Sequence, residues 1–309
     1  MKTTIMIPIQ SEMENTKLRD FISNLRAVDV FLVLVLFLYS LLGAVFHSRV
    51  KNWTLLTLTC IGMAFLFVGF NHLQQRMTRR FGRFFFRVLS VSIVLIYTYE
   101  AALRLMFIIW PTWKDQALIN LERVIFGVQP TIWLQAFIFP GLTEWMMFSY
   151  LSYFALYPTV SAVLYFRRGE DVMEKFLFLL CFNNIFCNAL YLFFPVDNPM
   201  STLGHLYTVP LKGYVFTAAG EYLRAHLMSA GGGMPSGHVA ATLVMLLTVF
   251  RDDRRSFYAL APVGFSVILA TFYCRFHYLS DSVMGLLAGL ICWWVAPAVR
   301  KSINRSLAP

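Results

Sequence analysis

The chain has 309 residues, of which 58% are hydrophobic and only 14% are charged. Soluble domains carry roughly 25% charged residues, so this composition excludes an ordinary soluble protein. The apolar residues also fall in runs close to the roughly 20 residues needed to cross a hydrocarbon core. We therefore expect an all-α fold, a polytopic membrane helical bundle.

The net charge of +10 comes from basic residues that cluster between the apolar runs. The clusters lie within residues 76–87, 167–175, 251–255 and 300–305. This distribution is typical of the positive-inside bias of membrane proteins. No basic stripe alternates with aromatic residues as on a soluble nucleic-acid-binding surface, so we expect no nucleic-acid partner.

Eight apolar runs are predicted to span the membrane. In chain order they cover residues 30–47, 53–71, 86–110, 142–166, 176–194, 237–250, 257–274 and 277–298. Placing the N-terminus in the cytoplasm puts the basic clusters on the same side, so we expect both termini there. Charged and polar residues precede the first run, so no cleaved signal peptide is expected. The short loops favour a bacterial inner membrane.

These spans divide the chain into four predicted parts. They are a cytoplasmic N-terminal segment (1–29), two additional spans with a basic cytoplasmic loop (30–85), a six-span catalytic core (86–299) and a cytoplasmic tail (300–309).

Two outer connections in the core are too long to be simple turns. Residues 111–141 carry Asp115, Leu118, Leu121 and Ile125 at helical spacing, which predicts an amphipathic helix along the interface. The second connection, residues 195–236, is rich in Gly and Pro and is either a spacer or a functional loop.

The end of the second connection reads GGGMPSGH over residues 231–238, and an apolar run follows directly. Glycines allow backbone conformations that other residues avoid and let a ligand approach closely. Ser236 is placed to cap the next helix, whose free N–H groups and positive dipole end attract phosphate. Ser236 and Gly237 are therefore candidate phosphate-binding residues, and His238 in the first turn could reach the anion. The alternative is a capped glycine loop with an incidental histidine.

A second motif, RFHYLSD over residues 275–281, opens the last span. His277 and Asp281 are four residues apart, so on a helix they share one face and can form a hydrogen bond. A carboxylate on one imidazole nitrogen fixes the tautomer and leaves the other nitrogen as a nucleophile or base. Arg275 supplies a planar donor fork suited to phosphate oxygens. In isolation, the pair could equally be an interfacial polar contact.

The predicted topology brings both motifs to the outer membrane surface. His238 starts one inward-running span, and His277 and Asp281 start the next. Ionisable residues so close to hydrocarbon are costly, which favours a functional site facing outward.

The PSGH sequence ending at His238 and the pair His277-x-x-x-Asp281 resemble two signatures of the type 2 phosphatidic acid phosphatase superfamily. Its members are membrane lipid phosphatases and phosphotransferases, and the resemblance covers the six spans of residues 86–298. Three details look like the inositolphosphorylceramide synthase-like branch. They are GGMPSGH over 232–238, RFHY over 275–278 and the upstream Phe126-Gly127.

By this resemblance, His277 would attack phosphorus and carry a phosphohistidine intermediate, with Asp281 orienting it. His238 would protonate the departing lipid alkoxide or phosphate, and water or an acceptor hydroxyl would then attack the phosphohistidine. Arg275 and the amides at the helix end would stabilise the phosphate charge.

The chain also departs from the superfamily pattern. Its first signature, a Lys followed seven residues later by Arg-Pro, is absent, and the nearest equivalent is FPVDNPM over residues 194–200. Met200 stands where relatives in the branch often carry Arg, and Thr271 stands where the third signature usually has Arg. The outer connection offers three candidate contacts to the phosphate or headgroup: Lys212, Arg224 and Asp197.

Three functions are consistent with these residues. We favour a lipid phosphatase that hydrolyses a lipid phosphate or diphosphate at the outer face. The alternative is a lipid phosphotransferase, which passes a phosphate-bearing headgroup to another alcohol. The missing first-signature cations favour transfer, because a phosphodiester carries less charge than a terminal phosphate. A non-catalytic lipid carrier is the third function, and it would leave both histidines without a role.

No metal or other cofactor is expected. The five cysteines lie inside or at the ends of apolar runs, and none forms a C-x-x-C pair. No carboxylate cluster lies beside the histidines in the sequence. The expected partners are a lipid phosphate and the bilayer.

Overall fold

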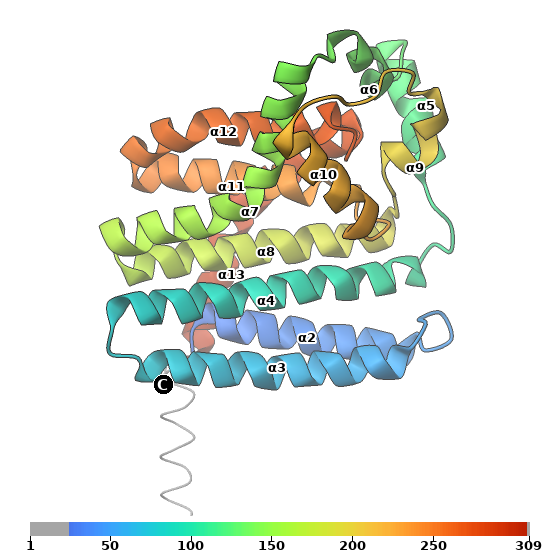
Figure 1. Cartoon of the computed structure of the whole chain (residues 1–309). Helices are drawn as coiled ribbons and strands as arrows, with labels where there is room; N and C mark the ends of the chain where they lie inside the picture. The colour runs from blue at the N-terminus through green and yellow to red at the C-terminus, as the bar shows by residue number, and fades with distance from the viewer. Residues whose placement is uncertain (1–24, 308–309) are drawn as a thin grey trace, which may run out of the picture.

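The computed structural model describes residues 25–307, and this part of the chain contains helices and no β-strand (Figure 1). Seven of its helices are long and apolar enough to cross a membrane. The protein is therefore an integral membrane protein with the polytopic helical bundle expected from its composition. Most of the predicted N-terminal segment, residues 1–29, lies outside the described residues.

The seven long helices correspond to seven of the eight predicted spans. They are α2 (Ala27–Val45), α3 (Trp53–Arg76), α4 (Arg80–Leu105) continued by η1 (Met106–Ile108), α7 (Pro140–Arg168), α8 (Glu170–Phe193), α12 (Arg254–Tyr273) and α13 (Leu279–Leu307). The last helix continues beyond the predicted end at residue 298, so the predicted tail begins inside α13.

The eighth predicted span corresponds to α11 (Gly237–Asp252), which has 16 residues and is shorter than the other seven. It packs against α7, α8, α12 and α13, and most of its side chains are buried. A helix of this length rises only about 24 Å. Because four neighbouring helices pack around α11, they also hold the motif at its start.

Short helices cover one end of the bundle, which we call the site end (Figure 1). They are α5 (Asp115–Phe126), α6 (Pro130–Trp133), η2 (Leu134–Phe137), α9 (Pro199–Leu203), η3 (Gly204–Leu206) and α10 (Val215–His226). These helices are formed by the two long connections. At the opposite end, called the basic end, the turns before α4, α8 and α12 carry arginine clusters.

Helix α5 is the amphipathic helix predicted within residues 111–141, but its faces differ from the expected ones. Asp115 and Leu118 are buried, whereas Leu121 and Ile125 are exposed beside Val124, which is 83% exposed. The four residues at helical spacing thus do not share one face. The exposed apolar side of α5 suits contact with lipid, and the buried side carries carboxyl groups.

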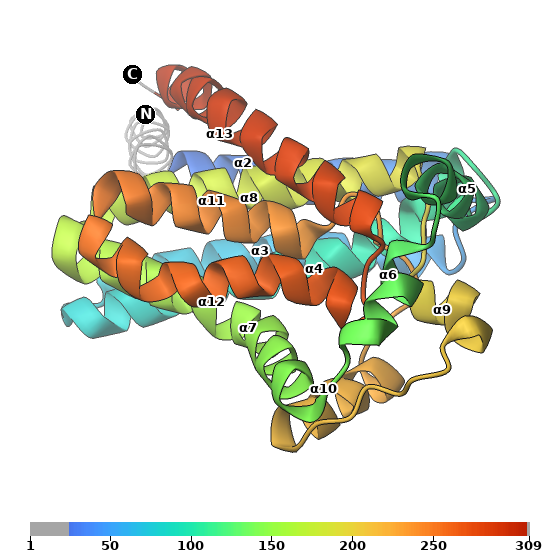
Figure 2. The same ribbon diagram turned by 90° about the horizontal axis from the view of Figure 1, so that it is seen from above.

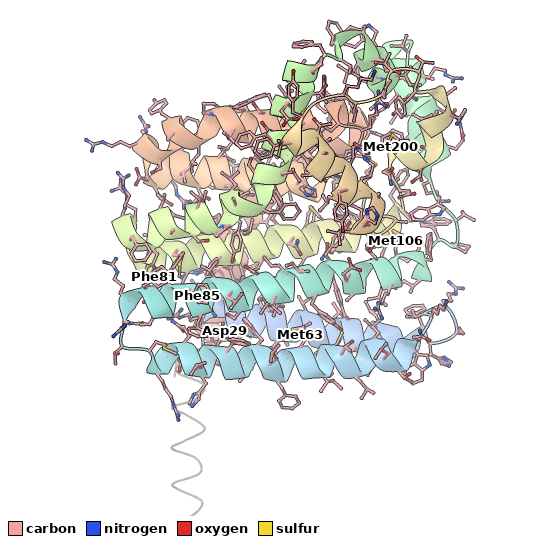
Figure 3. The ribbon with its side chains drawn as sticks, in the orientation of Figure 1. Asp29, Met63, Phe81, Phe85, Met106 and Met200 are labelled. Carbon is pink, nitrogen blue, oxygen red and sulfur yellow. The ribbon has the colours of Figure 1, made fainter. Side chains whose placement is uncertain are left out.

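Paired polar groups join the N-terminal helices to the core near the basic end. Arg87 on α4 is 1% exposed and donates to both carboxylate oxygens of Glu174 on α8, at 2.8 and 2.7 Å. Its Nη1 donates to Asp29 on α2 at 2.6 Å and to Asn71 on α3 at 2.8 Å. We call these four residues the Arg87 cluster, and Figure 3 shows Asp29 toward the basic end.

Two glycines let α11 and α13 approach closely beside the site. A Cβ atom added to Gly285 would lie 2.6 Å from the Ser236 carbonyl oxygen, and one added to Gly289 would lie 2.9 Å from the Ala240 carbonyl oxygen. Small residues at this four-residue spacing allow close packing of membrane helices. Helix α13 runs obliquely across the bundle (Figure 2), and this glycine seam fixes its start against the start of α11.

Candidate active site

Two loops meet at the site end. The glycine loop, residues 231–236, precedes α11, and the histidine loop, residues 274–278, joins α12 to α13. Gly231 and Gly232 have positive φ angles of 103° and 72°, which favour glycine. Gly233 N donates to the Val196 carbonyl oxygen at 3.0 Å, so the glycine loop is fastened to the segment that follows α8.

Ser236 caps α11 as the sequence predicts. Its Oγ accepts a hydrogen bond from Val239 N at 3.4 Å, and the helix begins at Gly237. The first amides of a helix have no partner within the helix and lie at its positive dipole end. The start of α11 therefore has the properties of an anion site, and phosphate binding there stays a prediction.

His277 is held by backbone groups of α12 and of the glycine loop. Its backbone N–H donates to the Thr271 carbonyl oxygen at 2.9 Å. In the side chain, Nδ1 lies 3.0 Å from the Gly233 carbonyl oxygen and 3.5 Å from Asp281 Oδ2. A carbonyl can only accept, so Nδ1 carries the proton in this contact and Nε2 keeps its lone pair. The imidazole is thus oriented for attack through Nε2.

Asp281 lies near His277, but the two residues are not on one helix as the sequence predicted. Helix α13 begins at Leu279, so His277 precedes it and the two residues do not share a helical face. Asp281 Oδ2 accepts from Tyr278 N at 2.9 Å, and its backbone carbonyl accepts from Ser236 N at 2.9 Å. Asp281 therefore gives Nδ1 of His277 a second, longer contact and also links the two loops.

His238 lies against an aromatic wall on α7. Its ring centroid is 4.4 Å from that of Tyr153, 5.0 Å from Tyr150 and 6.3 Å from Phe154. These three residues share one face of α7 because they are three and four positions apart. Within residues 25–307, no group forms a hydrogen bond with the His238 ring. The His277 centroid is 5.9 Å away, so two imidazoles with available nitrogens stand side by side.

The two arginines beside the histidine loop bind protein groups. Arg275 is 3% exposed, its Nη2 donates to the Val209 carbonyl oxygen at 2.5 Å, and its guanidinium covers the Tyr207 ring at 4.0 Å. Burial lowers the pKa of Arg275 from its ordinary value. Arg224 on α10 donates to the carbonyl oxygens of Arg275 and Cys274. Both guanidinium groups brace the histidine loop, and the phosphate contact expected from Arg275 stays a prediction.

The other candidate residues lie around the two loops. Asp197 Oδ1 accepts from Gly231 N at 3.0 Å, so Asp197 shapes the glycine loop. Lys212 is exposed at the site end. Thr271, at the position of the missing arginine, is buried, and its Oγ1 lies 2.9 Å from Ser282 Oγ on α13. These contacts are structural, and a role in headgroup binding for Lys212, Arg224 or Asp197 stays a prediction.

Two carboxylates on α5 hold residues 278–280, a role that the sequence analysis missed. Glu122 is fully buried, and its Oε1 accepts from the N–H and the hydroxyl of Ser280, each at 2.8 Å. Asp115 Oδ1 accepts from the Tyr278 hydroxyl at 3.1 Å. Burial raises the pKa of both carboxyl groups. We call this pair the α5 clamp. Its seven-residue spacing, about two helical turns, was the signal that could have identified it.

This arrangement can perform nucleophilic displacement with acid–base assistance. His277, with its Nδ1 proton held, can attack through Nε2, and His238 can exchange a proton with the group on the other side of the reacting atom. The amides at the start of α11 can stabilise negative charge. Within residues 25–307, no three His, Cys, Asp or Glu side chains are grouped so that they could hold a metal ion.

A comparison with known families identifies one match. The family model of the PAP2 superfamily matches residues 116–295, more than half of the chain, and this range contains both histidines and Asp281. No curated protein and no solved structure matches the chain. The name PAP2 denotes the type 2 phosphatidic acid phosphatases, which the two motifs resemble. The matched range, the helical architecture and the paired histidines lead to one conclusion: the chain belongs to the PAP2 superfamily.

Proposed function

We propose that the protein is a membrane lipid phosphatase that hydrolyses a lipid phosphate or diphosphate through a phosphohistidine on His277. Membership of the PAP2 superfamily supports a phosphatase-type activity. One observation carries the proposal further. His277 Nδ1 is bound at 3.0 Å to the Gly233 carbonyl oxygen, so Nε2 is the free nucleophile and His238 lies beside it.

In the first step, His277 Nε2 attacks phosphorus, an N–P bond forms, and the bond from phosphorus to the lipid oxygen breaks. Protonated His238 gives its proton to the departing oxygen. Asp281, 3.5 Å from Nδ1, balances the positive charge of the phosphorylated ring. In the second step, neutral His238 takes a proton from water, the water oxygen attacks phosphorus, and the N–P bond breaks. Inorganic phosphate leaves, and both histidines return to their starting states.

A lipid substrate is supported by the position of the aromatic wall. Phe154 lies 6.3 Å from His238 by ring centroids and is 57% exposed on the outside of α7. Because α7 is one of the long apolar helices, its outside is expected to contact acyl chains. Phe154 therefore lies between His238 and the surface of the bundle where a lipid would bind.

Headgroup transfer to an alcohol is the second candidate, and the arginine contacts favour it. The guanidinium groups of Arg275 and Arg224 bind backbone carbonyls, and Met200 on α9 occupies a position where the branch often carries Arg (Figure 3). A site with few free cations suits a singly charged phosphodiester better than a doubly charged phosphate monoester. Transfer would use the same two histidines, with an alcohol in place of water.

The charge distribution supports an orientation. We infer that the basic end faces the cytoplasm and that the site end faces outward, as the positive-inside bias predicts. A bacterial inner membrane remains our proposal for the location. Accessibility of a cysteine introduced at exposed Lys212 to a membrane-impermeant thiol reagent in intact cells tests the orientation. Labelling only after cell lysis would contradict it.

The function is tested with purified protein in detergent micelles and a panel of lipid phosphates, lipid diphosphates and phosphoinositides. Free phosphate and lipid products are measured together, for wild type, His277→Ala and the control His72→Ala, an exposed histidine on α3. Free phosphate from wild type and control, but not from His277→Ala, is the result expected of a phosphatase. A new headgroup lipid without free phosphate would instead establish transfer. Equal turnover by wild type and His277→Ala would refute the phosphohistidine mechanism, and inactivity with a native lipid extract would favour a non-catalytic carrier.

A further inference from the structure

A second charged site lies at the basic end, across the bundle from the histidines. An open pocket of about 580 Å³ lies where the α7–α8 and α11–α12 turns meet. Its lining consists of Arg167, Arg168, Arg251, Asp252, Arg254 and Arg255. We call this cavity the arginine pocket. The mechanism proposed above does not use any of these residues.

The walls of the arginine pocket are held by short, capped turns. Only Gly169 separates α7 from α8, and only Asp253 separates α11 from α12. Asp253 is buried, its Oδ1 accepts from Ser256 N at 3.4 Å, and its Oδ2 binds Arg167 Nε at 2.8 Å. This ion pair fastens the end of α7 to the start of α12. The two walls therefore keep a fixed separation.

The arginine pocket carries unbalanced positive charge. Five guanidinium groups face two carboxylates, Asp252 and Asp253, which leaves an excess of three positive charges. Asp252 is engaged by Arg251 through two hydrogen bonds, at 2.9 and 2.8 Å. The helix dipoles offset one another here, because α7 and α11 end at the pocket and α8 and α12 begin there. Like charges gathered in one concave site repel each other unless an anion joins them.

Two of these arginines, Arg251 and Arg254, lie over aromatic rings. The Arg251 guanidinium covers the Trp293 ring at 4.8 Å, and that of Arg254 covers the Phe250 ring at 5.0 Å. The ring contact orients the Arg254 donor fork before any ligand binds, which reduces the entropy lost on binding. The Arg251 fork is held by Asp252. Planar forks of this kind match phosphate oxygens in pairs.

From the cavity, the excess charge and the oriented forks, we propose that the arginine pocket binds a phosphate-bearing anion. The positive-inside bias explains basic residues at this end but does not require them to line one pocket. Two sources carry the same chemistry: the headgroup of an anionic phospholipid in the adjacent leaflet, or a soluble phosphate.

The test compares two double variants that remove the same charge from the same end. Arg254→Gln with Arg255→Gln alters the pocket, and Arg76→Gln with Arg79→Gln alters exposed residues at the α3–α4 turn. Binding to the purified full chain in neutral detergent is measured by native mass spectrometry and thermal shift. The probes are phosphatidylglycerol, inorganic phosphate and, as the neutral reference, phosphatidylethanolamine.

We expect the pocket variant to lose at least tenfold in affinity for one anionic probe, about 1.4 kcal/mol. The control variant should stay within twofold of wild type. Loss confined to phosphatidylglycerol identifies a lipid site, and loss for inorganic phosphate identifies a soluble-anion site. Equal loss in both variants, or no preference of wild type for either anionic probe, overturns the proposal. Both variants should keep the wild-type elution volume, because the four arginines are exposed.

Discussion

The Arg87 cluster and the histidine site are both buried polar groups inside an apolar bundle, but they are paired to different degrees. In the Arg87 cluster, each side-chain nitrogen and oxygen of the four residues has a partner within the described chain. At the histidine site, Asp281 Oδ1 and Glu122 Oε2 are buried without a partner, and the His238 ring forms no hydrogen bond within residues 25–307.

The difference in pairing indicates that the Arg87 cluster stabilises the fold, whereas the histidine site can bind a substrate. A buried ion pair whose hydrogen bonds are complete joins helices and leaves nothing to offer a ligand. Unpaired polar atoms in a buried site cost stability, and they persist where a substrate supplies the missing partners. The comparison predicts that changes in the Arg87 cluster affect folding, whereas changes around the histidines affect turnover.

The largest effect is expected from His238→Ala. Removing the proton donor and acceptor should lower kcat by about 10²- to 10⁴-fold, the usual contribution of a positioned acid–base group. The thermal midpoint should stay close to that of wild type, because the ring forms no hydrogen bond in the described structure. A large fall in thermal midpoint, with unchanged kcat for the folded fraction, would show that His238 has a structural role and would contradict the prediction.

Arg87→Ala is expected to act on stability instead. It leaves Asp29 and Glu174 buried without their shared cation, which typically costs about 3–5 kcal/mol. Unfolding in mixed micelles measures the change, and kcat of the folded fraction should be unchanged. The matched control, Arg76→Ala, removes an exposed arginine near the same end and should change stability by less than about 0.5 kcal/mol.

Glu122→Ala tests the α5 clamp. Its expected effect on kcat is smaller than that of His238→Ala. Losing both contacts to Ser280 should displace the histidine loop and lower kcat by roughly tenfold to a hundredfold. Glu122→Gln keeps an acceptor oxygen and should restore most of kcat. The control Gln129→Ala removes a contact to the Ile119 carbonyl on the same helix, without touching residues 278–280. Equal losses of kcat in Glu122→Ala and Gln129→Ala would show that the α5 clamp has no specific role in positioning the histidine loop.

The smallest effect is expected in the pH dependence of stability. Burial raises the pKa of Glu122, so the folded state favours its protonated form. This contribution is complete below the ordinary glutamate pKa of about 4.3 and is lost as the pH rises through the raised value. The thermal midpoint of wild type should therefore fall relative to that of Glu122→Gln as the pH increases. Parallel midpoints across this range would contradict a buried, titrating Glu122.

Much of the fold could be predicted from the sequence, because membrane spans depend on local apolar runs. The runs located all eight helices, and Ser236 marked the start of α11 correctly. The distribution of basic residues predicted the orientation of the bundle but not the environment of each arginine. Arg87 was assigned to a cytoplasmic basic cluster, but it is buried among α2, α3, α4 and α8. Its partners are distant in sequence, and no local pattern identifies them.

The site was predictable in its residue types and less so in its contacts. The two motifs identified His238, His277 and Asp281, and the structure brings all three together. The shortest contact of His277 is to a backbone carbonyl, that of Gly233, and every residue type carries such a group. Arg275 has side-chain features suited to phosphate, yet its guanidinium binds the Val209 carbonyl. Pairing of this kind depends on the tertiary fold.

The glycine seam between α11 and α13 also limits which sequences can keep this site. The atoms nearest to an added Cβ at Gly285 and Gly289 are the backbone carbonyl oxygens of Ser236 and Ala240. A side chain can shrink to make room, but a carbonyl oxygen is present in every residue. No second substitution can therefore compensate for a larger residue at either glycine. Over evolution, exposed Leu287 is expected to vary among apolar residues while both glycines stay fixed.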